Sequence, residues 1–589
     1  MPTAFRLLLA AALSLTAATS ALATTIAQVD IRGIDAPMTQ NVRDALSLVD
    51  ALGKDVSDRR LAYLLRQATP ETRDALAPFG YFSPTIHVER TAGGTAVTST
   101  IVTITVDRGA PVRVRASHVA IDGAGNNDSA LQQELATFTP GIGDIFNQGV
   151  YEDSKTRVSR RLAERGYFDA DFLARRVEVT RAANAADINL VWASGARYAM
   201  GPATFTQEPD AILRDALLHK LVKWTPGSPF EQGKIDRLRK SLVALDDFSG
   251  IDIQPHPDRA INHAVPVTVT LKPAKRSIYT AGLSYGTDSG AGVRLGVERR
   301  YLNSRGHKAL AQIDYAQRRK TLTLQYRIPA FAWLDGWYTV SLQGADEQTD
   351  YIDTRRMELV GSRSGTINTH LTAVAALHAL RERWSYPGDI GNTAYQYGSF
   401  LFPSLRGDYI DVDDRLYPRR GMGTSLELRG GSKGLGSDAT FLQLHGRASW
   451  FHGMGPRDRL ILRGELGHTF TEDLINLPPS LRFYAGGDRS IRGYNDREVG
   501  PRLGTFGLGA NNLLTASSEF EHYFTPQWGG AVFVDTGSAF NGSTPDWHTG
   551  VGIGVRWRSP VGPVRVDVAR GLDQPDSPLT VYLNIGADL

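Results

Sequence analysis

The residues best suited to a specific polar interaction lie at positions 486–494, where Arg492 stands among glycines in the run Gly-Gly-Asp-Arg-Ser-Ile-Arg-Gly-Tyr. A guanidinium offers five donors in a planar fork and can clamp a carboxylate bidentately. The glycines let the backbone turn sharply and approach another segment closely. Such a run could pin a long loop against the protein wall, although the Arg-Gly-Tyr tripeptide alone is also typical of an ordinary surface turn.

Catalytic chemistry has little support in the sequence. The chain holds 13 histidines, but no His pair at metal-ligand spacing and no Gly-x-Ser-x-Gly elbow. A cluster of four aspartates could bind a cation, yet the glycine and glutamate positions of a calcium loop are missing, which favours a solvated loop: Asp408, Asp411, Asp413 and Asp414. We therefore expect a protein that is not an enzyme and uses no metal or cofactor.

The N-terminal residues have the pattern of an export signal. Arg6 precedes an apolar stretch from Leu7 to Leu15, and Ala21-Leu22-Ala23 provides a small-residue cleavage site. An uncleaved anchor helix is the alternative, but the apolar stretch is shorter than the roughly 20 residues that span a bilayer. The sequence therefore predicts a signal peptide over residues 1–23.

The composition limits which classes of protein remain possible. A chain of 589 residues must form several domains, and zero cysteines exclude a disulfide framework or thiolate metal site. The net charge of +3 is nearly neutral for this length and indicates no nucleic-acid partner. No later stretch approaches 18 consecutive apolar residues, so a membrane-spanning part would have to be a closed β-barrel.

An internal repeat occupies the first half of the chain. Gly80-Tyr81-Phe82 recurs as Gly166-Tyr167-Phe168, and Pro140-Gly141 recurs as Pro226-Gly227, each 86 residues later. We expect the aromatic residues of both Gly-Tyr-Phe runs to cap the core of their own unit rather than to bind a partner.

Each repeat shows a change from helical to strand periodicity. One helical face is marked by Tyr151, Val158 and Leu162 in the second unit and by Ile235, Leu238, Leu242 and Leu245 in the third. The closing strands alternate instead, as at Val102, Ile104 and Val106; Ile188, Leu190 and Trp192; and Val267, Val269 and Leu271. These patterns predict three α+β domains of order β-α-α-β-β over residues 24–108, 109–195 and 196–275.

The second half of the chain has a different composition. Residues 1–276 hold 17 of the 59 glycines, and the other 42 follow. Helical periodicity disappears there, and alternating segments such as 322–326, 338–342 and 579–583 are separated by turns rich in Gly, Asp, Asn and Pro. A spanning strand with its turn takes about 20 residues, so residues 276–589 predict a barrel of about 16 strands.

A soluble sandwich or blade array would also alternate in this way. The aromatic residues near expected strand ends favour the barrel, because outer-membrane barrels carry aromatic girdles at both interfaces: Tyr301, Trp333, Trp337, Trp384, Trp450, Phe451 and Trp528.

Three segments together resemble the outer-membrane assembly superfamily that includes BamA, TamA and the two-partner secretion transporters: 486–494, 532–537 and 552–557. The segment 413–421 is similar to the mid-barrel hairpin of that superfamily. In that superfamily the arginine of the sixth extracellular loop enters the barrel lumen and pairs with acidic wall residues. The resemblance implies a lumen latch made of Arg492, Gly493, Tyr494, Asp535 and Arg556.

The three N-terminal units resemble polypeptide-transport-associated (POTRA) domains, and a count of three resembles the TamA family. Segments 78–86 and 282–290 support this narrower match, although the chain ends in Leu589 rather than in the usual aromatic residue. The family implies an outer-membrane location with periplasmic POTRA domains, a TamB-like inner-membrane-anchored partner, unfolded outer-membrane protein or autotransporter clients, and contact with outer-membrane lipid.

The expected mechanism is lateral opening between the first and last barrel strands, at about 277–289 and 579–589. Glycine weakens a strand, and an opened seam would expose unpaired backbone groups that template an incoming strand. The gate residues we expect are Gly282, Gly286, Leu583 and Ile585. A BamA-like or two-partner-secretion-type transporter and a passive porin are the alternatives.

Overall fold

A computed structural model describes residues 24–92, 99–286, 290–331, 335–349, 352–385, 395–504, 506–559, 562–573 and 578–585. The expected signal peptide at 1–23 lies outside the described residues. The chain divides into two compact units, one holding residues up to 202 with 224–235 and 255–267, and the other holding 203–223, 236–254 and the rest. Among the described residues, no helix is both long enough and apolar enough to cross a membrane.

The first repeat is larger than the expected five elements. Its four-stranded sheet has the order β2-β1-β4-β3, with β1 parallel to β4. The added strand β2 pairs with the start of β1 through Thr24 and Val56, and α2 is an added short helix. The elements are β1 (Thr24–Arg32), α1 (Ala36–Ala45), α2 (Ser47–Asp50), β2 (Asp55–Val56), α3 (Asp58–Leu76), β3 (Thr85–Ala92) and β4 (Ser99–Asp107).

The second and third repeats have the predicted order of strand, two helices and two strands. The second forms the sheet β5-β7-β6 and comprises β5 (Arg113–Asp122), α4 (Ser129–Ala136), α5 (Gln148–Glu164), β6 (Asp171–Thr180) and β7 (Ala185–Ala193). The third forms the sheet β8-β10-β9 and comprises β8 (Ala199–Gln207), α6 (Asp215–His219), α7 (Gln232–Leu245), β9 (Phe248–Pro255) and β10 (Ala264–Pro273). The predicted apolar faces of α5, α7 and the closing strands β4, β7 and β10 are all buried, which confirms those periodicities.

The Gly-Tyr-Phe runs lie where one repeat meets the next. Tyr81 and Tyr167 are buried in the core of their own repeat, as expected. Phe82 instead packs against the core of the second repeat, and Phe168 contacts the ring of Phe230 in the third with centroids 4.8 Å apart. The expectation that all four rings cap their own unit is therefore wrong for the two phenylalanines, because successive side chains leave the backbone in different directions.

The glycine of each run has the same role in both places. Gly80 and Gly166 have φ near +90°, and their carbonyls accept hydrogen bonds of 2.8 Å from the backbone of Val112 and Tyr198, which are themselves 86 residues apart. A side chain at Gly80 would come within 2.6 Å of the backbone of Phe146. The sequence repeat therefore encodes a repeated joint between consecutive units.

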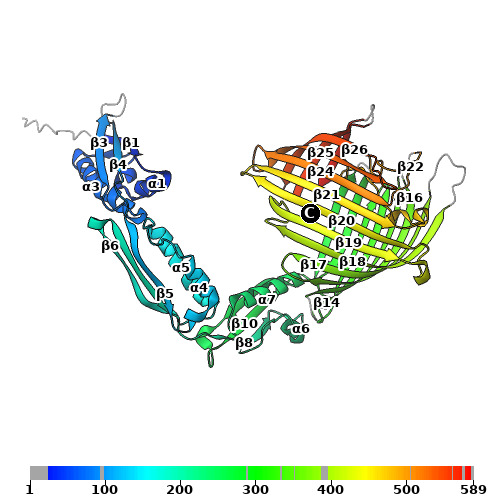
Figure 1. Ribbon diagram of the computed structural model, residues 1–589, viewed down its shortest axis with the longest axis horizontal. Helices are drawn as coiled ribbons and strands as arrows, with labels where there is room; N and C mark the ends of the chain where they lie inside the picture. Colours follow the sequence, from blue (N-terminus) through cyan, green and yellow to red (C-terminus); the bar gives the residue numbers. More distant parts are fainter. Residues whose placement is uncertain are drawn as a thin grey trace, which may run out of the picture. The chain divides into compact units, whose positions relative to one another are not determined.

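The second half of the chain forms one antiparallel sheet of 16 strands, ordered along the sequence from β11 to β28, that curls into a barrel in which β11 lies against β28 (Figure 1). The predicted barrel and strand number are confirmed. The strands are β11 (Ser277–Gly286), β12 (Gly290–Arg299), β13 (Lys308–Ala316), β14 (Arg319–Ala330), β15 (Gly336–Gln348), β16 (Asp353–Thr366), β17 (Leu371–Ser385), β18 (Gln396–Val412), β19 (Arg420–Gly431), β20 (Phe441–Met454), β21 (Asp458–Phe470), β24 (Asn512–Tyr523), β25 (Trp528–Phe540), β26 (His548–Ser559), β27 (Gly562–Gly571) and β28 (Thr580–Ile585).

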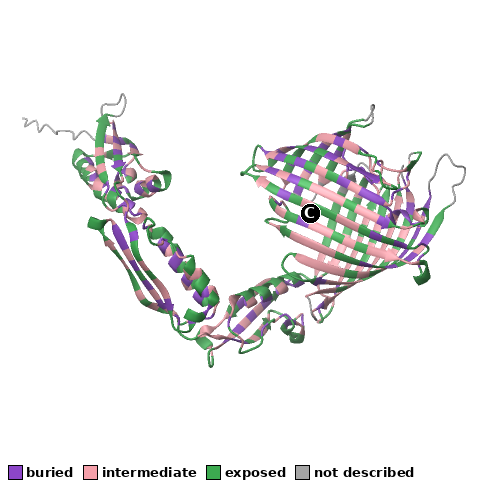
Figure 2. Ribbon diagram, in the orientation of Figure 1, coloured by how far each residue is buried: buried purple, intermediate pink, exposed green. Residues whose placement is uncertain are grey.

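Exposed and less exposed residues alternate along these strands (Figure 2). The alternation places one set of side chains outward and the other in the lumen. Trp450 and Trp528 lie outward and are exposed. Trp384 and Phe451 are only 2% exposed and belong to the inward set, so the girdle expected of them is wrong, whereas Trp333 lies outside the described residues.

Candidate functional site

The loop between β21 and β24, residues 471–511, folds against the barrel wall. It carries a small sheet of β22 (Arg502–Leu503) and β23 (Phe506–Gly507), and it buries Phe483, Ile491, Tyr494 and Val499 in one cluster with residues of β24 and β25. The loop therefore has its own apolar core on the wall and is held by packing as well as by polar contacts.

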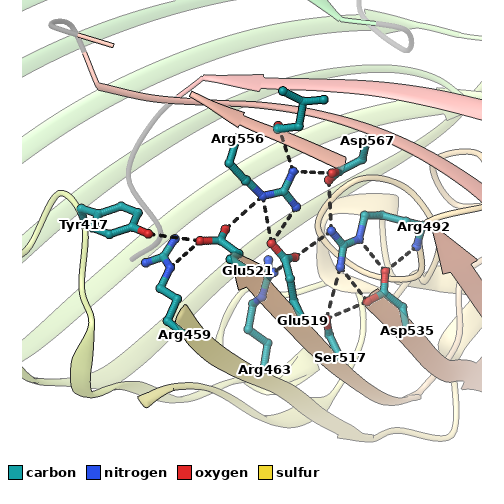
Figure 3. A network of polar contacts seen from close by, with 11 residues as sticks. Tyr417, Arg459, Arg463, Arg492, Ser517, Glu519, Glu521, Asp535, Arg556 and Asp567 are labelled. Carbon is teal, nitrogen blue, oxygen red and sulfur yellow. Dashed lines mark hydrogen bonds and ion pairs between the residues drawn. The ribbon is translucent and has the colours of Figure 1, made fainter. Parts of the chain in front are cut away.

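Arg492 is the centre of the polar contacts. Its Nε and Nη2 donate to the two carboxylate oxygens of Asp535 at 2.7 and 2.9 Å, and its backbone N–H donates to the same group at 3.1 Å (Figure 3). Its Nη1 donates to Glu519 at 2.9 Å and to Asp567 at 3.0 Å. The side chain is 4% exposed and lies over the ring of Phe533. One loop cation therefore joins three wall strands, β24, β25 and β27.

A second buried arginine extends this network. Arg556 on β26 donates from Nη2 to Glu519 at 2.6 Å, from Nε to Glu521 at 3.0 Å, and from Nη1 to Asp567 at 2.5 Å. The Glu519 carboxylate therefore bridges the loop arginine and the wall arginine. The sequence prediction grouped Arg492, Asp535 and Arg556, and the structure brings all three into one network, with Glu519 and Asp567 between Arg492 and Arg556.

Two further arginines, both on β21, pair with the glutamates of this network. Arg463 donates to Glu519 at 2.6 Å, and Arg459 donates to Glu521 at 2.5 Å. Arg459 also lies over the ring of Tyr417, whose hydroxyl donates to Glu521 at 3.3 Å. The network in Figure 3 joins four arginines to four carboxylates, and a fifth buried arginine, Arg565 on β27, interacts electrostatically with Glu519 and Glu521.

Gly493 and Tyr494 attach the loop to the last strands. The Tyr582 hydroxyl on β28 donates to the carbonyl of Tyr494 at 2.7 Å and accepts from the backbone N–H of Gly493 at 3.0 Å. The Tyr494 hydroxyl donates to Asp573 at 2.9 Å. On the same side, Asn584 donates to Asp488 at 3.1 Å. Two of the predicted latch residues, Gly493 and Tyr494, therefore contact β28 directly.

Glycines on the wall make room for the loop. A Cβ at Gly550 would lie 1.8 Å from the carbonyl oxygen of Arg492, and one at Gly571 would lie 2.6 Å from the Tyr494 ring. A Cβ at Gly554 would lie 1.9 Å from Asp567. The Gly-rich run on β26 is therefore a surface against which a backbone and a buried charge network pack closely.

The predicted gate residues occupy the first and last strands. Gly282 pairs with Arg294 and Gly286 with Gly290, both between β11 and β12. On β28, Leu583 pairs with Val566 and is 42% exposed, whereas Ile585 pairs with Val564 through its backbone. The parts of the expected gate at 287–289 and 586–589, and the side chain of Ile585, lie outside the described residues.

The sequence prediction missed the other buried acidic residues of the barrel wall that belong to the Arg492 network. Glu519, Glu521 and Asp567 are buried on strands that otherwise alternate, and Tyr582 and Asn584 on β28 both bind the loop. The signal was present in Glu519-Phe520-Glu521, because acids at period two on a strand share one face. The sequence of β24 alone does not show that the loop covers this face.

The four aspartates of the acidic cluster are divided between a strand and a turn: Asp408 and Asp411 lie within β18, and Asp413 and Asp414 lie in the hairpin turn that follows it. Asp413 accepts from the backbone N–H of Arg419 at 2.8 Å and of Arg420 at 3.1 Å, and Asp414 accepts from that of Leu416 at 2.7 Å, between β18 and β19. Among the described residues, no group of three or more His, Asp or Glu is arranged to hold a metal ion.

Comparison with known protein families identifies the superfamily to which this architecture belongs. The model for the Omp85 superfamily domain matches residues 302–588. The chain belongs to the Omp85 superfamily. Two further models match this Omp85 protein, "POTRA domain TamA domain 1" over residues 28–108 and "POTRA: Surface antigen variable number repeat" over residues 114–191.

Two curated relatives of the Omp85 chain are named outer membrane protein assembly factor BamA. The protein of Nitratidesulfovibrio vulgaris is 24% identical over 389 residues, and that of Neisseria meningitidis is 23% identical over 389 residues. These matches cover 61% and 58% of this chain and 47% of each relative, so the chain spans about half the length of those proteins. The crystal structure of Haemophilus ducreyi BamA lacking POTRA domains 1–3 has the same fold, with a TM-score of 0.63 at 14% identity over 81% of this chain and 99% of that one.

Proposed function

We propose that this Omp85 protein lies in the bacterial outer membrane with its POTRA domains in the periplasm, and that it inserts or secretes outer-membrane proteins by opening between β11 and β28. The names of the two BamA relatives support an assembly role. The observation that carries the proposal is the pair of hydrogen bonds between the Tyr582 hydroxyl on β28 and the loop. These bonds lie beside β11, the strand that would separate from β28.

The geometry makes the two sides of the seam unequal. β28 is tied to the loop by Tyr582 and Asn584, and the loop is tied to β24, β25 and β27 by Arg492. β11 contains Gly282 and Gly286, which give its pairing partners no side chain to pack against. Opening would then move β11 away while β28 stays on the loop.

An opened edge would act as a template. Unpaired backbone groups in the bilayer cost several kcal/mol each, so an incoming strand that pairs with the exposed edge is strongly favoured. Strand addition of this kind uses main-chain hydrogen bonds and forms no covalent bond. The function proposed is therefore non-enzymatic.

A disulfide across the seam tests this mechanism. The natural chain has no cysteine, so no native thiol competes with a pair introduced at outward positions of β11 (Tyr279, Ala281 or Leu283) and β28 (Val581 or Leu583), and non-reducing gels separate the intramolecular disulfide from cross-linked dimers. We expect the oxidised protein to keep its barrel fold but to lose assembly of a client barrel into liposomes, and reduction to restore it. Single-cysteine variants are the controls, and full assembly by a quantitatively cross-linked barrel would refute lateral opening.

Within the superfamily, we propose a role in a translocation and assembly module, with a TamB-like partner, autotransporter clients and contact with outer-membrane lipid. The match of residues 28–108 to the first POTRA domain of TamA supports this choice. β3 is the longer of the two edge strands of that domain, and an edge can accept a partner strand.

Photo-crosslinking in whole envelopes tests the partner. We expect a photoreactive residue at His87 or Glu89 on β3 to capture an inner-membrane-anchored protein, and one at Arg66 on the exposed side of α3 to capture none. Equal capture by the β3 probes and the Arg66 probe, or no capture by the β3 probes, would contradict a partner at this edge.

A further inference from the structure

An outward-facing row of charged residues crosses β14 to β17. Strand register places Lys320 opposite Asp346, Asp346 opposite Arg355, and Arg355 opposite Arg383. Directly opposite residues share one face of a sheet. That face is the outer one, because Leu322, Leu324 and Met357, which alternate with the inward residues of the same strands, are exposed. The row is therefore on the outside of the barrel and not in the lumen.

The next rows become apolar toward the middle of the strands. Leu322, Gly344, Met357 and Arg381 stand opposite one another in the second row. The third row is entirely apolar and consists of Leu324, Leu342, Leu359, Ala379 and Leu401. An amphiphile with an anionic head and apolar tails would match this order of side chains.

A groove accompanies the charged rows. It has a volume of about 590 Å³ and is lined by residues that include Lys320, Leu322, Arg355, Met357, Arg381 and Arg383. Gly344 is also part of its lining, and a Cβ built on Gly344 would meet no atom within 4 Å. The absence of a side chain at Gly344 therefore leaves open space between the charged row and the apolar row.

The charge of the groove is positive and incompletely matched. Arg355 forms an ion pair with Asp346 at 2.6 Å. Arg383 lies over the ring of Tyr395, and its buried Nε has no hydrogen-bond partner among the described residues. Lys320, Arg381 and Arg383 remain beside this pair. The other carboxylates of the lining are already bound, because Asp314 pairs with Arg294 and Glu382 accepts from the Thr354 and Ser480 hydroxyls. Asp353 lies nearby and accepts from the Tyr395 hydroxyl at 3.1 Å. A buried guanidinium N–H favours an anionic oxygen ligand.

The row lies at a defined end of the barrel. β11 follows the third repeat directly and begins at Ser277, so the repeats adjoin that end of the strands. Register carries the charged row through Tyr315 and Val293 to Leu283, which is near the opposite end of β11. With the repeats in the periplasm, the charged row would lie in the outer leaflet.

We propose that this groove binds the head of a phosphorylated glycolipid that carries two phosphates, with its acyl chains on the apolar rows. The inference rests on the proposed outer-membrane location. Neighbouring strands are about 4.8 Å apart, so Lys320 on β14 and Arg383 on β17 are separated by roughly 14 Å, a span that one phosphate group cannot bridge. Two phosphates at the ends of a disaccharide fit that separation, and guanidinium groups suit phosphate geometry.

Lipid binding to the full chain tests the proposal. The protein is placed in nanodiscs of phosphatidylcholine, and bound lipid A, monophosphoryl lipid A and phosphatidylglycerol are compared by native mass spectrometry. We expect lipid A to bind most tightly, and the double variant Arg381→Gln/Arg383→Gln to weaken it by roughly tenfold or more. Gly344→Phe, which fills the groove without changing charge, should weaken it similarly.

Control variants distinguish binding in this groove from non-specific attraction of anionic lipid to the other cationic residues at this end of the barrel. Arg570→Gln removes an exposed cation at the same end of β27, and Gly446→Phe adds a ring on β20, away from the groove and its rows, at a position where a Cβ would lie no closer than 3.5 Å to a neighbour. Both should bind lipid A like the natural chain. Equal losses in the control and groove variants, or equal affinity for lipid A and phosphatidylglycerol, would overturn the proposal. No client is present in this measurement, so failure of the assembly function would not produce either result.

Discussion

At the scale of single residues, Arg492 joins a loop to a wall that would otherwise hold buried carboxylates. A buried ion pair contributes little net stability when both partners are present, because desolvation offsets the attraction. Removing one partner is costly because the other charge stays buried. Loss of Arg492 from the wall would therefore take the bidentate cation from buried Asp535, whereas Glu519 and Asp567 would keep their ion pairs with Arg556.

Replacement of Arg492 tests this role. We expect Arg492→Ala to lower the free energy of unfolding by about 3–5 kcal/mol, and Arg492→Lys to recover part of the loss, because an ammonium cannot make the bidentate contact. Denaturant titration in detergent, followed by heat-modifiability gels, measures the change. The control is Arg489→Ala, which removes an exposed arginine of the same loop; a loss as large in the control would contradict the assignment.

Gly493 offers a second test, because its backbone approaches the wall. It has φ +101°, and a Cβ there would lie 2.5 Å from the backbone carbon of Arg570. We expect Gly493→Ala to displace the loop tip and to speed hydrogen exchange at Gly493 and Tyr494. Gly504 also has positive φ, at +60°, but a Cβ there would meet nothing within 4 Å. Gly504→Ala therefore carries the backbone strain without the clash, and equal effects of the two variants would exclude the close approach as the cause.

At the scale of elements, the repeats are joined by a device that recurs in sequence and in geometry. In each Gly-Tyr-Phe run the tyrosine is buried in its own repeat, and the phenylalanine packs on the next one. Small domains bury little surface, so contacts between neighbours contribute much of their stability. The aromatic run is therefore a joint rather than a binding site.

Phe168→Ala tests the joint between the second and third repeats. Loss of a packed phenylalanine ring costs about 3–5 kcal/mol in a core and should cost less at this partly exposed contact. We expect faster hydrogen exchange in residues 198–201 and 228–230, with no change in α5. Leu173, which is 60% exposed on β6, provides the control substitution Leu173→Ala. Protection of α5 lost together with the joint would show that Phe168 supports its own repeat instead.

At the scale of the whole molecule, the third repeat is tied to the first barrel strands by buried charge. Lys308 on β13 donates to Asp247 at 2.5 Å, and both side chains are at most 3% exposed. Around this pair, Arg300 donates to Asp246 at 2.9 Å. These contacts fix the place where the last repeat leads into the barrel.

Asp247 should make this contact depend on pH. Burial raises the pKa of its carboxyl to about 6, although the ammonium of Lys308 acts to lower it. Because the folded pKa is above the unfolded value of about 3.9, the folded state binds the proton more tightly, and stability falls as pH rises from about 4 to about 6, by about 3 kcal/mol in total. Hydrogen exchange of β9 and the start of β13, corrected for intrinsic rates, should show protection decreasing over that range.

The double variant Asp247→Asn/Lys308→Met provides the control, because it removes both charges and avoids leaving a buried ammonium unpaired. Its protection should not change between pH 4 and pH 6. A natural chain whose protection increases over this range would show that the ion pair, and not desolvation, dominates the pKa of Asp247.

Several features of the fold could be predicted because they depend on local periodicity. The barrel strands, the helices at Tyr151–Leu162 and Ile235–Leu245, and the 86-residue repeat all follow from side chains that recur with the period of their element. The additional strand β2 was not predictable in this way, since two residues, Asp55 and Val56, are too short a run to show a period.

Local patterns in the chain specify the types of groups available for a latch: one arginine among glycines in a long loop, and acids at alternate positions on late strands. Which of these groups meet depends on the three-dimensional fold. Glu519, Asp567 and Tyr582 come within reach of the loop because the sheet closes on itself and brings β24 to β28 around one lumen. Strand register fixes neighbours across a sheet, whereas contact across a lumen depends on curvature and on the path of the loop, which no local pattern encodes.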